Sequence, residues 1–362
     1  MSTPIHPHII ALGWNDPERA RAFSTWLEAQ VEGHGLQPET LRLASADASF
    51  RRYFRMNSGH ESRVIMDAPP ELENCRPFVQ VAELMAKAGL NAPRILDWDE
   101  AQGFMLLTDL GQRTLMQCMD EQAGAANLPW FKQALDVLIS WQMASRPGVL
   151  PPYDEAVLRR ELALFPDWYV ARHKDTVLNA SQQAVLQQAF DLIVQRNLAA
   201  PQVYVHRDFM PRNLMVSDEG TGPLGVLDFQ DALYGPVTYD LASLTRDAFI
   251  SWDEELVLDV SVRYWERARQ TGLLDFEDWA QDFGAFYRAV EWMGLQRHLK
   301  VAGIFARLTL RDGKPKYLAD TPRFLGYIRA TAARYRELMP LLRLIDVIEG
   351  TTPATGIAFG RV

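Results

Sequence analysis

The sequence predicts an α+β protein in two parts: an N-terminal antiparallel sheet with helices, then a larger and mostly helical part. Three observations predict this class. Apolar residues alternate with a period of two between residues 41 and 108, which is typical of strands. From Asp120 onward they recur at helical spacing. A short strand and hairpin, Val203–Phe229, interrupt the helical part. We place the first part at 1–108 and the second at 109–362.

Composition limits the class of protein. Apolar residues make up 48% of the 362 residues, a share typical of globular proteins, and the net charge of −9 argues against a general nucleic-acid binder. The two cysteines, Cys75 and Cys118, fit a reducing compartment and offer no metal framework. The N-terminal segment has no basic region followed by an apolar run, and no stretch is long and apolar enough to span a membrane. We therefore expect a cytoplasmic protein.

The first part is expected to begin with a helix and to continue as a sheet. Asn15-Asp16-Pro17-Glu18 combines a capping side chain with proline in the first turn, which is typical of a helix start. This helix should end near Gly33. The alternating pattern then predicts a five-stranded antiparallel sheet with one further helix. The strands are expected at 41–44, 50–56, 63–67, 94–98 and 104–108, and the helix at 77–88.

The stretch Val203–Phe229 carries the polar residues on which a functional assignment depends. A short strand leads to Asp208, and Asn213 precedes a hairpin whose return strand ends at Asp228. Residues equally far from a turn face each other across a hairpin, so we expect Asn213 and Asp228 to lie side by side, next to Asp208. Carboxylate and amide oxygens are suitable ligands for Mg²⁺, which completes its shell with phosphate oxygens and water.

The spacing His-x-Asp-x-x-x-x-Asn, followed by a hairpin and Asp, is typical of the catalytic core of kinase-like phosphotransferases. The segments HRDFMPRN and LDFQDALYGPVTYDLASL resemble the aminoglycoside phosphotransferase family of small-molecule kinases, which includes choline-kinase-like proteins. The general resemblance covers most of the chain. It implies a bilobal protein-kinase-like fold, with a nucleotide-binding N-lobe and a larger, mostly helical C-lobe that carries the catalytic hairpin. It also implies ATP and Mg²⁺ as cofactors.

The resemblance gives each polar residue of this core a role. Asp208 would accept the proton of the acceptor hydroxyl, or orient that hydroxyl for in-line attack. Asn213 and Asp228 would hold Mg²⁺ across the phosphates. His206 and Asp240 would support the catalytic loop without touching the substrate.

The same resemblance places the ATP phosphates at the turn 45–49, where Ser45 and Ser49 offer hydroxyl groups. This turn has no glycine, and Met66 stands where the third strand of a protein kinase carries a lysine. Arginine must then supply the positive charge, since a guanidinium group can grip phosphate bidentately. The candidates lie at the second strand: Arg51, Arg52 and Arg55.

The other nucleotide contacts are expected from the helix 77–88 and from the link between the lobes. On this helix, Glu83 is expected to pair with the arginine charge. The hinge backbone should hydrogen-bond adenine, and two side chains of the sheet should cover one face of the ring. The residues expected around the adenine are therefore Tyr53, Val64, Thr108, Asp109 and Leu110.

The acceptor is expected to be a small molecule. Only a short run separates Asp228 from Asp240, too short for the activation segment with which protein kinases seat a peptide. With ASFRRYFR and MDAPPE, the core segments resemble most closely the family members that phosphorylate amino sugars. This implies transfer to the anomeric hydroxyl of N-acetylmuramate or N-acetylglucosamine during peptidoglycan recycling. The helix after residue 286 mixes aromatic and charged residues, as a sugar-binding wall would. The expected acceptor contacts are Asp231, Glu291, Trp292 and Arg297.

Two alternatives stay open from the sequence. The acceptor could be another small molecule of this family, such as an aminoglycoside, choline or homoserine. The missing lysine and the glycine-free turn also suit a nucleotide-binding pseudokinase that acts as an interaction module. In either case we expect a monomer that binds neither nucleic acid nor a membrane.

Overall fold

The structure is a computed structural model that describes residue 9 and residues 12–14, 16–46, 50–218, 220 and 222–351, with the main chain alone for Ser45 and Ala46. The chain divides into two compact units. Unit 1 comprises Met1–Thr114 and Leu214–Asp231, and unit 2 comprises Leu115–Asn213 and Ala232–Val362. The hairpin strands after Asn213 are thus grouped with the N-terminal sheet, whereas the expected boundary at 108 had left them in the second part.

Unit 1 is built on the predicted five-stranded antiparallel sheet, in the order β1-β2-β3-β5-β4. Its strands are β1 (Leu36–Ala46), β2 (Arg52–Ser58), β3 (Glu61–Asp67), β4 (Ile95–Asp99) and β5 (Phe104–Thr108). Alternation along β2 divides the side chains between two faces. Phe54 and Met56 join the main hydrophobic core of this unit, while Tyr53 and Arg55 point to the opposite face.

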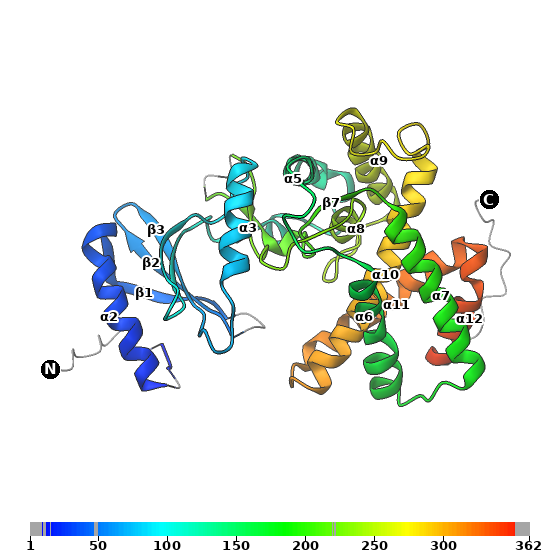
Figure 1. The fold of residues 1–362 in the computed structure, drawn as a ribbon, viewed down its shortest axis with the longest axis horizontal. Coiled ribbons are helices and arrows are strands. Elements are labelled where there is room, and N and C mark those ends of the chain that lie inside the picture. The colour runs from blue at the N-terminus through cyan, green and yellow to red at the C-terminus, as the bar shows by residue number, and fades with distance from the viewer. Residues whose placement is uncertain are drawn as a thin grey trace. The chain divides into compact units, whose positions relative to one another are not determined.

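Two helices lie on opposite sides of this sheet, α2 (Pro17–His34) and α3 (Arg76–Lys87) (Figure 1). The helix α2 starts at the predicted cap, where Asp16 accepts a hydrogen bond of 2.8 Å from the main-chain N–H of Glu18. Its Phe23 packs against Phe54 with ring centroids 5.2 Å apart, so α2 covers the core face of the sheet.

A small three-stranded sheet completes unit 1, formed by β6 (Arg113–Thr114), β8 (Leu214–Val216) and β9 (Gly225–Val226). Its close packing on the hinge explains two glycines. Gly111 has a φ of 105°, and a Cβ there would lie 3.1 Å from the carbonyl oxygen of Val216. A Cβ on Gly225 would lie 2.9 Å from Leu110. Any larger side chain at these positions would separate the hinge from the hairpin.

Unit 2 is mainly helical. Its helices are α4 (Leu115–Cys118), α5 (Leu128–Met143), α6 (Glu155–Leu164), α7 (Ala180–Ala199), α8 (Tyr239–Thr245), α9 (Glu254–Gln270), α10 (Phe283–Leu310), α11 (Thr321–Arg334) and α12 (Met339–Glu349). A nine-residue π-helical stretch, Phe165–His173, continues from α6. The long helix α10 packs against α6, α7, α8 and α11 (Figure 1). The two strands β7 (Gln202–Val205) and β10 (Leu233–Pro236) pair beside these helices. Among the helices that the structure describes, none is both long and apolar enough to cross a membrane.

Candidate active site

The catalytic loop leaves β7 in unit 2 and is held from behind by Asp240 of α8. This buried carboxylate accepts the main-chain N–H of His206 through Oδ2 at 2.6 Å and that of Arg207 through Oδ1 at 3.0 Å. Burial raises the pKa of Asp240, and the opposing effect of His206 and of these N–H donors favours its charged form. Asp240 therefore fixes the end of β7 from a position out of reach of any substrate.

The loop itself is a tight turn that closes on its own backbone. Nδ2 of Asn213 donates to the carbonyl oxygen of Asp208 at 2.9 Å, and the main-chain N–H of Asn213 donates to Met210 at 2.9 Å. His206 is buried and its Nδ1 accepts the N–H of Asp208 at 3.3 Å. Since Nδ2 of Asn213 is used in the loop, Oδ1 is the atom of this amide that can ligate a cation.

Asp208 follows a residue with an unusual backbone. Arg207 has a φ of 77°, in the left-handed region that non-glycine residues rarely occupy. Its side chain donates to Oε1 of Glu161 at 2.6 Å, and its carbonyl oxygen accepts from Nη1 of Arg297 at 2.9 Å. Such backbone conformations persist where surrounding contacts hold them, and they concentrate at functional sites.

Asp228 lies in unit 1 at the end of the hairpin, and it also has a positive φ, of 63°. Its Oδ1 accepts from Nε2 of Gln230 at 2.9 Å. The hairpin register differs from the expectation by one residue, because Leu214 pairs with Val226. The expected register, with Asn213 opposite Asp228, is therefore not the register of this hairpin, and a joint metal site of the two residues stays a prediction.

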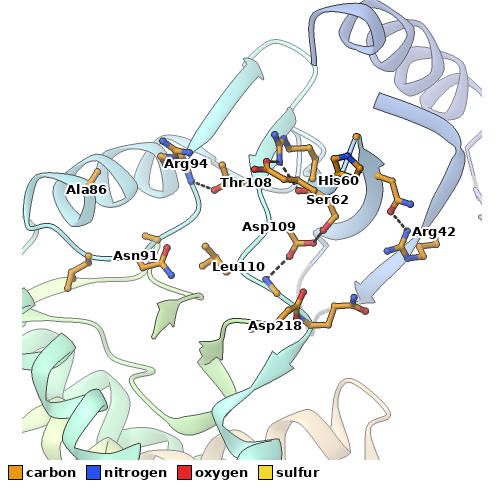
Figure 2. Close-up of a pocket in the computed structure, with 18 of the residues that line it drawn as sticks. Arg42, His60, Ser62, Ala86, Asn91, Arg94, Thr108, Asp109, Leu110 and Asp218 are labelled. Carbon is orange, nitrogen blue, oxygen red and sulfur yellow. Dashed lines mark hydrogen bonds and ion pairs between the residues drawn. The ribbon is translucent and has the colours of Figure 1, made fainter. Parts of the chain in front are cut away.

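The predicted hinge lines a polar pocket of about 850 Å³ in unit 1 (Figure 2). Thr108, Asp109 and Leu110 lie along its middle. The turn between β2 and β3 borders it on one side, and the end of α3 with the following loop borders it on the other. Tyr53 and Val64 are not among its lining residues. Their expected position over the adenine ring therefore stays a prediction, as do the main-chain contacts of the hinge with the base.

The side chain of Asp109 is fully engaged within the protein. It forms a two-point ion pair with Arg55, at 2.5 and 2.9 Å, and accepts the hydroxyl of Ser62 at 2.6 Å. Burial alone would raise the pKa of Asp109, but the hydrogen bonds from Arg55 and Ser62 lower it below the ordinary value. Arg55 therefore holds the hinge, and its contact with a phosphate stays a prediction.

The neighbouring arginines of β2 lie in different environments. Arg51 forms an ion pair of 3.0 Å with Glu73, in the connection between β3 and α3, and its side chain is about 10% exposed. Arg52 donates to the carbonyl oxygen of Leu12 at 2.9 Å and lies 4.3 Å from the ring centroid of Trp14. Arg52 thus packs on the α2 side of the sheet, and its contact with a phosphate stays a prediction. Arg51 remains the candidate.

Glu83, expected to pair with this charge, has a different partner in the structure. Glu83 lies on the outer face of α3 with 64% of its side chain exposed, and it pairs with Lys87 of the same helix at 3.7 Å. The sheet side of α3 carries apolar residues instead, including Val81 and Met85. Of the two phosphate-turn serines, Ser49 lies outside the described residues, and Ser45 belongs to β1 by its main chain.

The four expected acceptor residues are divided between the two units. Asp231 is exposed at the end of the unit 1 segment. Glu291 is buried on α10 and binds Arg334 and Tyr335, while Trp292 is buried against Tyr335. Arg297 is buried and reaches the catalytic loop through the carbonyl oxygen of Arg207. These contacts support a structural role for the α10 residues, and direct contact with an acceptor stays a prediction.

Two acidic partners of the arginines, one in each unit, were not among the predicted site residues. Glu73 binds Arg51, and Glu161 binds Arg207. The sequence offered only an indirect signal for these pairs. A buried arginine needs a carboxylate partner, but the neighbouring sequence does not identify which carboxylate that is. Within the described part of the chain, no cluster of three or more His, Cys, Asp or Glu side chains suits a metal ion.

Comparison with protein families gives a match over residues 40–281 to the model described as "Phosphotransferase enzyme family". Among curated proteins, the N-acetylmuramate/N-acetylglucosamine kinase of Pseudomonas aeruginosa is 50% identical over 341 residues, covering 91% of this chain and 97% of that protein. The protein of the same name from Neisseria meningitidis serogroup B is 48% identical, covering 88% and 94%.

Solved structures with a similar fold are far more distant in sequence. An ethanolamine kinase from Plasmodium vivax has a TM-score of 0.58 at 11% identity, covering 89% of this chain and 91% of its own. A choline kinase from Streptococcus pneumoniae has a TM-score of 0.55 at 12% identity, covering 85% and 99%. At such identities the likeness establishes the protein-kinase-like fold alone.

Proposed function

The chain belongs to the phosphotransferase enzyme family, and we propose that it is an ATP-dependent kinase that phosphorylates the anomeric hydroxyl of N-acetylmuramate or N-acetylglucosamine. The observation that carries this proposal is the identity of about 50% with a kinase of that name, over 91% of this chain and 97% of the relative. A match of this extent goes well beyond the catalytic segment alone. The reaction belongs to the recycling of peptidoglycan sugars.

The proposed mechanism relies on positioning and electrostatics. The acceptor hydroxyl lies at the carboxylate of Asp208, which orients it and accepts its proton. The hydroxyl oxygen then attacks the γ-phosphorus of ATP in line, and ADP leaves. Phosphoryl transfer needs little covalent catalysis by the protein. The main contribution of the protein is to hold the hydroxyl and the γ-phosphate close together and aligned. The closed loop from His206 to Asn213 serves this purpose, because it fixes the main chain on both sides of Asp208.

The donor set fits Mg²⁺. Asp228 offers a carboxylate and Asn213 an amide oxygen, which are hard ligands of the type that Mg²⁺ combines with phosphate oxygens. When bound, Mg²⁺ neutralises charge on the phosphates. The strained backbone of Asp228, with its φ of 63°, supports a functional role for this carboxylate. The cationic partner of the nucleotide is Arg51, in place of the missing strand lysine.

The proposal includes a cellular setting. ATP and recycled amino sugars meet in the cytoplasm, and free Cys75 and Cys118 are compatible with that reducing compartment. We propose a monomer that acts on a small molecule, without nucleic acid or membrane as a partner. The negative net charge of −9 supports the exclusion of nucleic acid.

The test is an acceptor panel with ATP and Mg²⁺. The purified chain is incubated with N-acetylmuramate, N-acetylglucosamine, an aminoglycoside, choline and homoserine, and ADP release is followed. Turnover with the two amino sugars is expected, and NMR of the product should place the phosphate on the anomeric carbon. Phosphate on another hydroxyl would refute the proposed regiochemistry.

Two other outcomes would replace the proposal. Turnover confined to the aminoglycoside, choline or homoserine would make the chain a kinase of another acceptor. Nucleotide binding without turnover on any acceptor would favour the pseudokinase module.

A further inference from the structure

A buried polar cluster lies behind the catalytic loop of unit 2, and Glu161 of α6 is at its centre. This carboxylate is only about 5% exposed. It accepts from Arg207 at 2.6 Å, from Nζ of Lys300 at 2.9 Å and from Nε2 of Gln296 at 3.0 Å. The hydroxyl of Tyr153 donates to it as well.

Glu161 is ionised at neutral pH despite its burial. Desolvation acts to raise its pKa, but the charges of Lys300 and Arg207 and the hydrogen bond from Tyr153 lower it from 4.5 to about 2. A carboxylate that meets two cations and two neutral donors satisfies the condition under which a buried charge is stable. Glu161 is therefore an anion held between two cations, Arg207 and Lys300.

Glu161 holds Arg207, the residue that precedes Asp208. Arg207 has a φ of 77°, in the left-handed region that a non-glycine residue adopts only where surrounding contacts hold it. Three contacts hold it: Asp240 binds its N–H, Arg297 binds its carbonyl oxygen, and Glu161 binds its guanidinium group. Glu161 is the one of the three that engages the side chain.

We propose that Glu161 is a positioning residue for the proposed phosphoryl transfer, and that it fixes Asp208 by holding the guanidinium group of Arg207. The inference rests on the proposed function for its kinetic test. In kinases whose activation segment is phosphorylated, new arginine–phosphate pairs order the active site. Here the carboxylate of Glu161 pairs with Arg207 in the unmodified protein. This agrees with the short segment between Asp228 and Asp240, which has no room for an activation segment. The catalytic loop is thus assembled without a modification.

The kinetic test compares Glu161→Gln with two controls from the same helix. Glu161→Gln keeps the shape and removes the charge. Glu161→Asp keeps the charge. Glu155→Gln removes an exposed carboxylate that pairs with Arg159 at 2.6 Å. We expect kcat of Glu161→Gln to fall by about 10²-fold, with KM for ATP and for the sugar within about threefold, since small displacements of a catalytic group cost rate of this order. Glu161→Asp should recover much of kcat, and Glu155→Gln should match wild type.

A second readout does not depend on the acceptor. Hydrogen exchange of the peptide 203–213 should be faster in Glu161→Gln than in wild type, and unchanged in Glu155→Gln. If Glu161→Gln does not fold, Arg207→Met is the second variant, because it keeps the Lys300–Glu161 ion pair. It should show the same loss of kcat and the same faster exchange.

Each outcome is decisive. A folded Glu161→Gln with wild-type kcat, or with wild-type exchange at 203–213, overturns the inference. So does a loss that appears in KM alone. Wild-type protein that is inactive on the amino sugars refutes the proposed function instead, and the exchange comparison then still decides whether Glu161 holds the loop.

Discussion

Arg55 and Asp109 join the second strand of the sheet to the hinge through a two-point ion pair, with N–O distances of 2.5 and 2.9 Å. Nη2 of Arg55 also donates to the carbonyl oxygen of Gly111 at 2.8 Å. Both side chains are largely shielded from solvent. The pair therefore fixes the chain direction at the point where it leaves the nucleotide-binding sheet.

Arg55→Met should destabilise the protein and weaken ATP binding together. It leaves the buried Asp109 without its cation, which costs about 2 kcal/mol once partial exposure is considered. The free energy of unfolding from urea titration should fall by about this amount, and KM for ATP should rise. Arg76→Gln, which breaks an exposed pair with Glu100 in the same unit, should change stability by less than about 0.5 kcal/mol. Equal effects of the two substitutions would contradict a special role for the hinge pair.

Arg51→Gln and Arg52→Gln should have different effects although the residues are adjacent: the first should weaken ATP binding, and the second should lower the stability of the fold. Arg51 is the candidate phosphate ligand, so Arg51→Gln should raise KM for ATP by about tenfold, equivalent to about 1.4 kcal/mol of binding. Arg52 packs on Trp14 and Phe54, so Arg52→Gln should lower stability by about 1 kcal/mol and leave KM unchanged. Initial-rate kinetics and thermal unfolding measure both. A higher KM for the Arg52 variant alone would reverse the assignment.

Asp208→Ala should retain nucleotide binding and lose turnover by roughly 10²–10⁴-fold, the usual contribution of a general base. The reason is that in the proposed mechanism Asp208 meets the acceptor hydroxyl, whereas other residues hold the nucleotide. ATP affinity by calorimetry and kcat by ADP release check the two halves separately. Turnover that survives unchanged would remove Asp208 from the reaction.

Asp228→Ala should weaken nucleotide binding only in the presence of Mg²⁺. In the proposed site this carboxylate would hold ATP through the cation, so removing it should eliminate the gain in ATP affinity that Mg²⁺ gives to wild type. Titrations of ATP with Mg²⁺ and with EDTA, on both proteins, measure that gain. If the variant responds to Mg²⁺ as wild type does, another residue holds the metal.

The five strands of the sheet were predictable because their signals are local. Period-two alternation and turn residues between 41 and 108 fixed the five strands to within a few residues, apart from an earlier start of β1 at Leu36. The catalytic loop was equally accessible, since its residues lie within one short segment. The predictions of the strands and of the catalytic loop both rest on residues that are close together in the chain.

The partners of the candidate arginines could not be predicted, for a physical reason that a sequence does not contain. Arg51 pairs with Glu73 just before β2, whereas Arg52, the first residue of β2, lies on the side of the sheet that α2 covers. Likewise Glu161 reaches Arg207 across 46 residues of chain, through the packing of α6 beside the catalytic loop. Partners so distant are set by tertiary structure.

The lowered pKa of Glu161 also predicts how the free energy of unfolding depends on pH. Its pKa is about 2 in the folded protein against 4.5 for an unperturbed glutamate, so the unfolded chain binds the proton first as pH falls. The stabilisation is complete above pH 4.5 and is lost as pH decreases toward 2, up to about 3 kcal/mol. Urea unfolding at pH 6, 4 and 3 should therefore show the stability gap between wild type and Glu161→Gln narrowing with acidity. Glu155→Gln should stay parallel to wild type over the same range. A constant gap for Glu161→Gln would mean that its carboxylate titrates normally, and that Lys300 and Arg207 do not hold it as an anion.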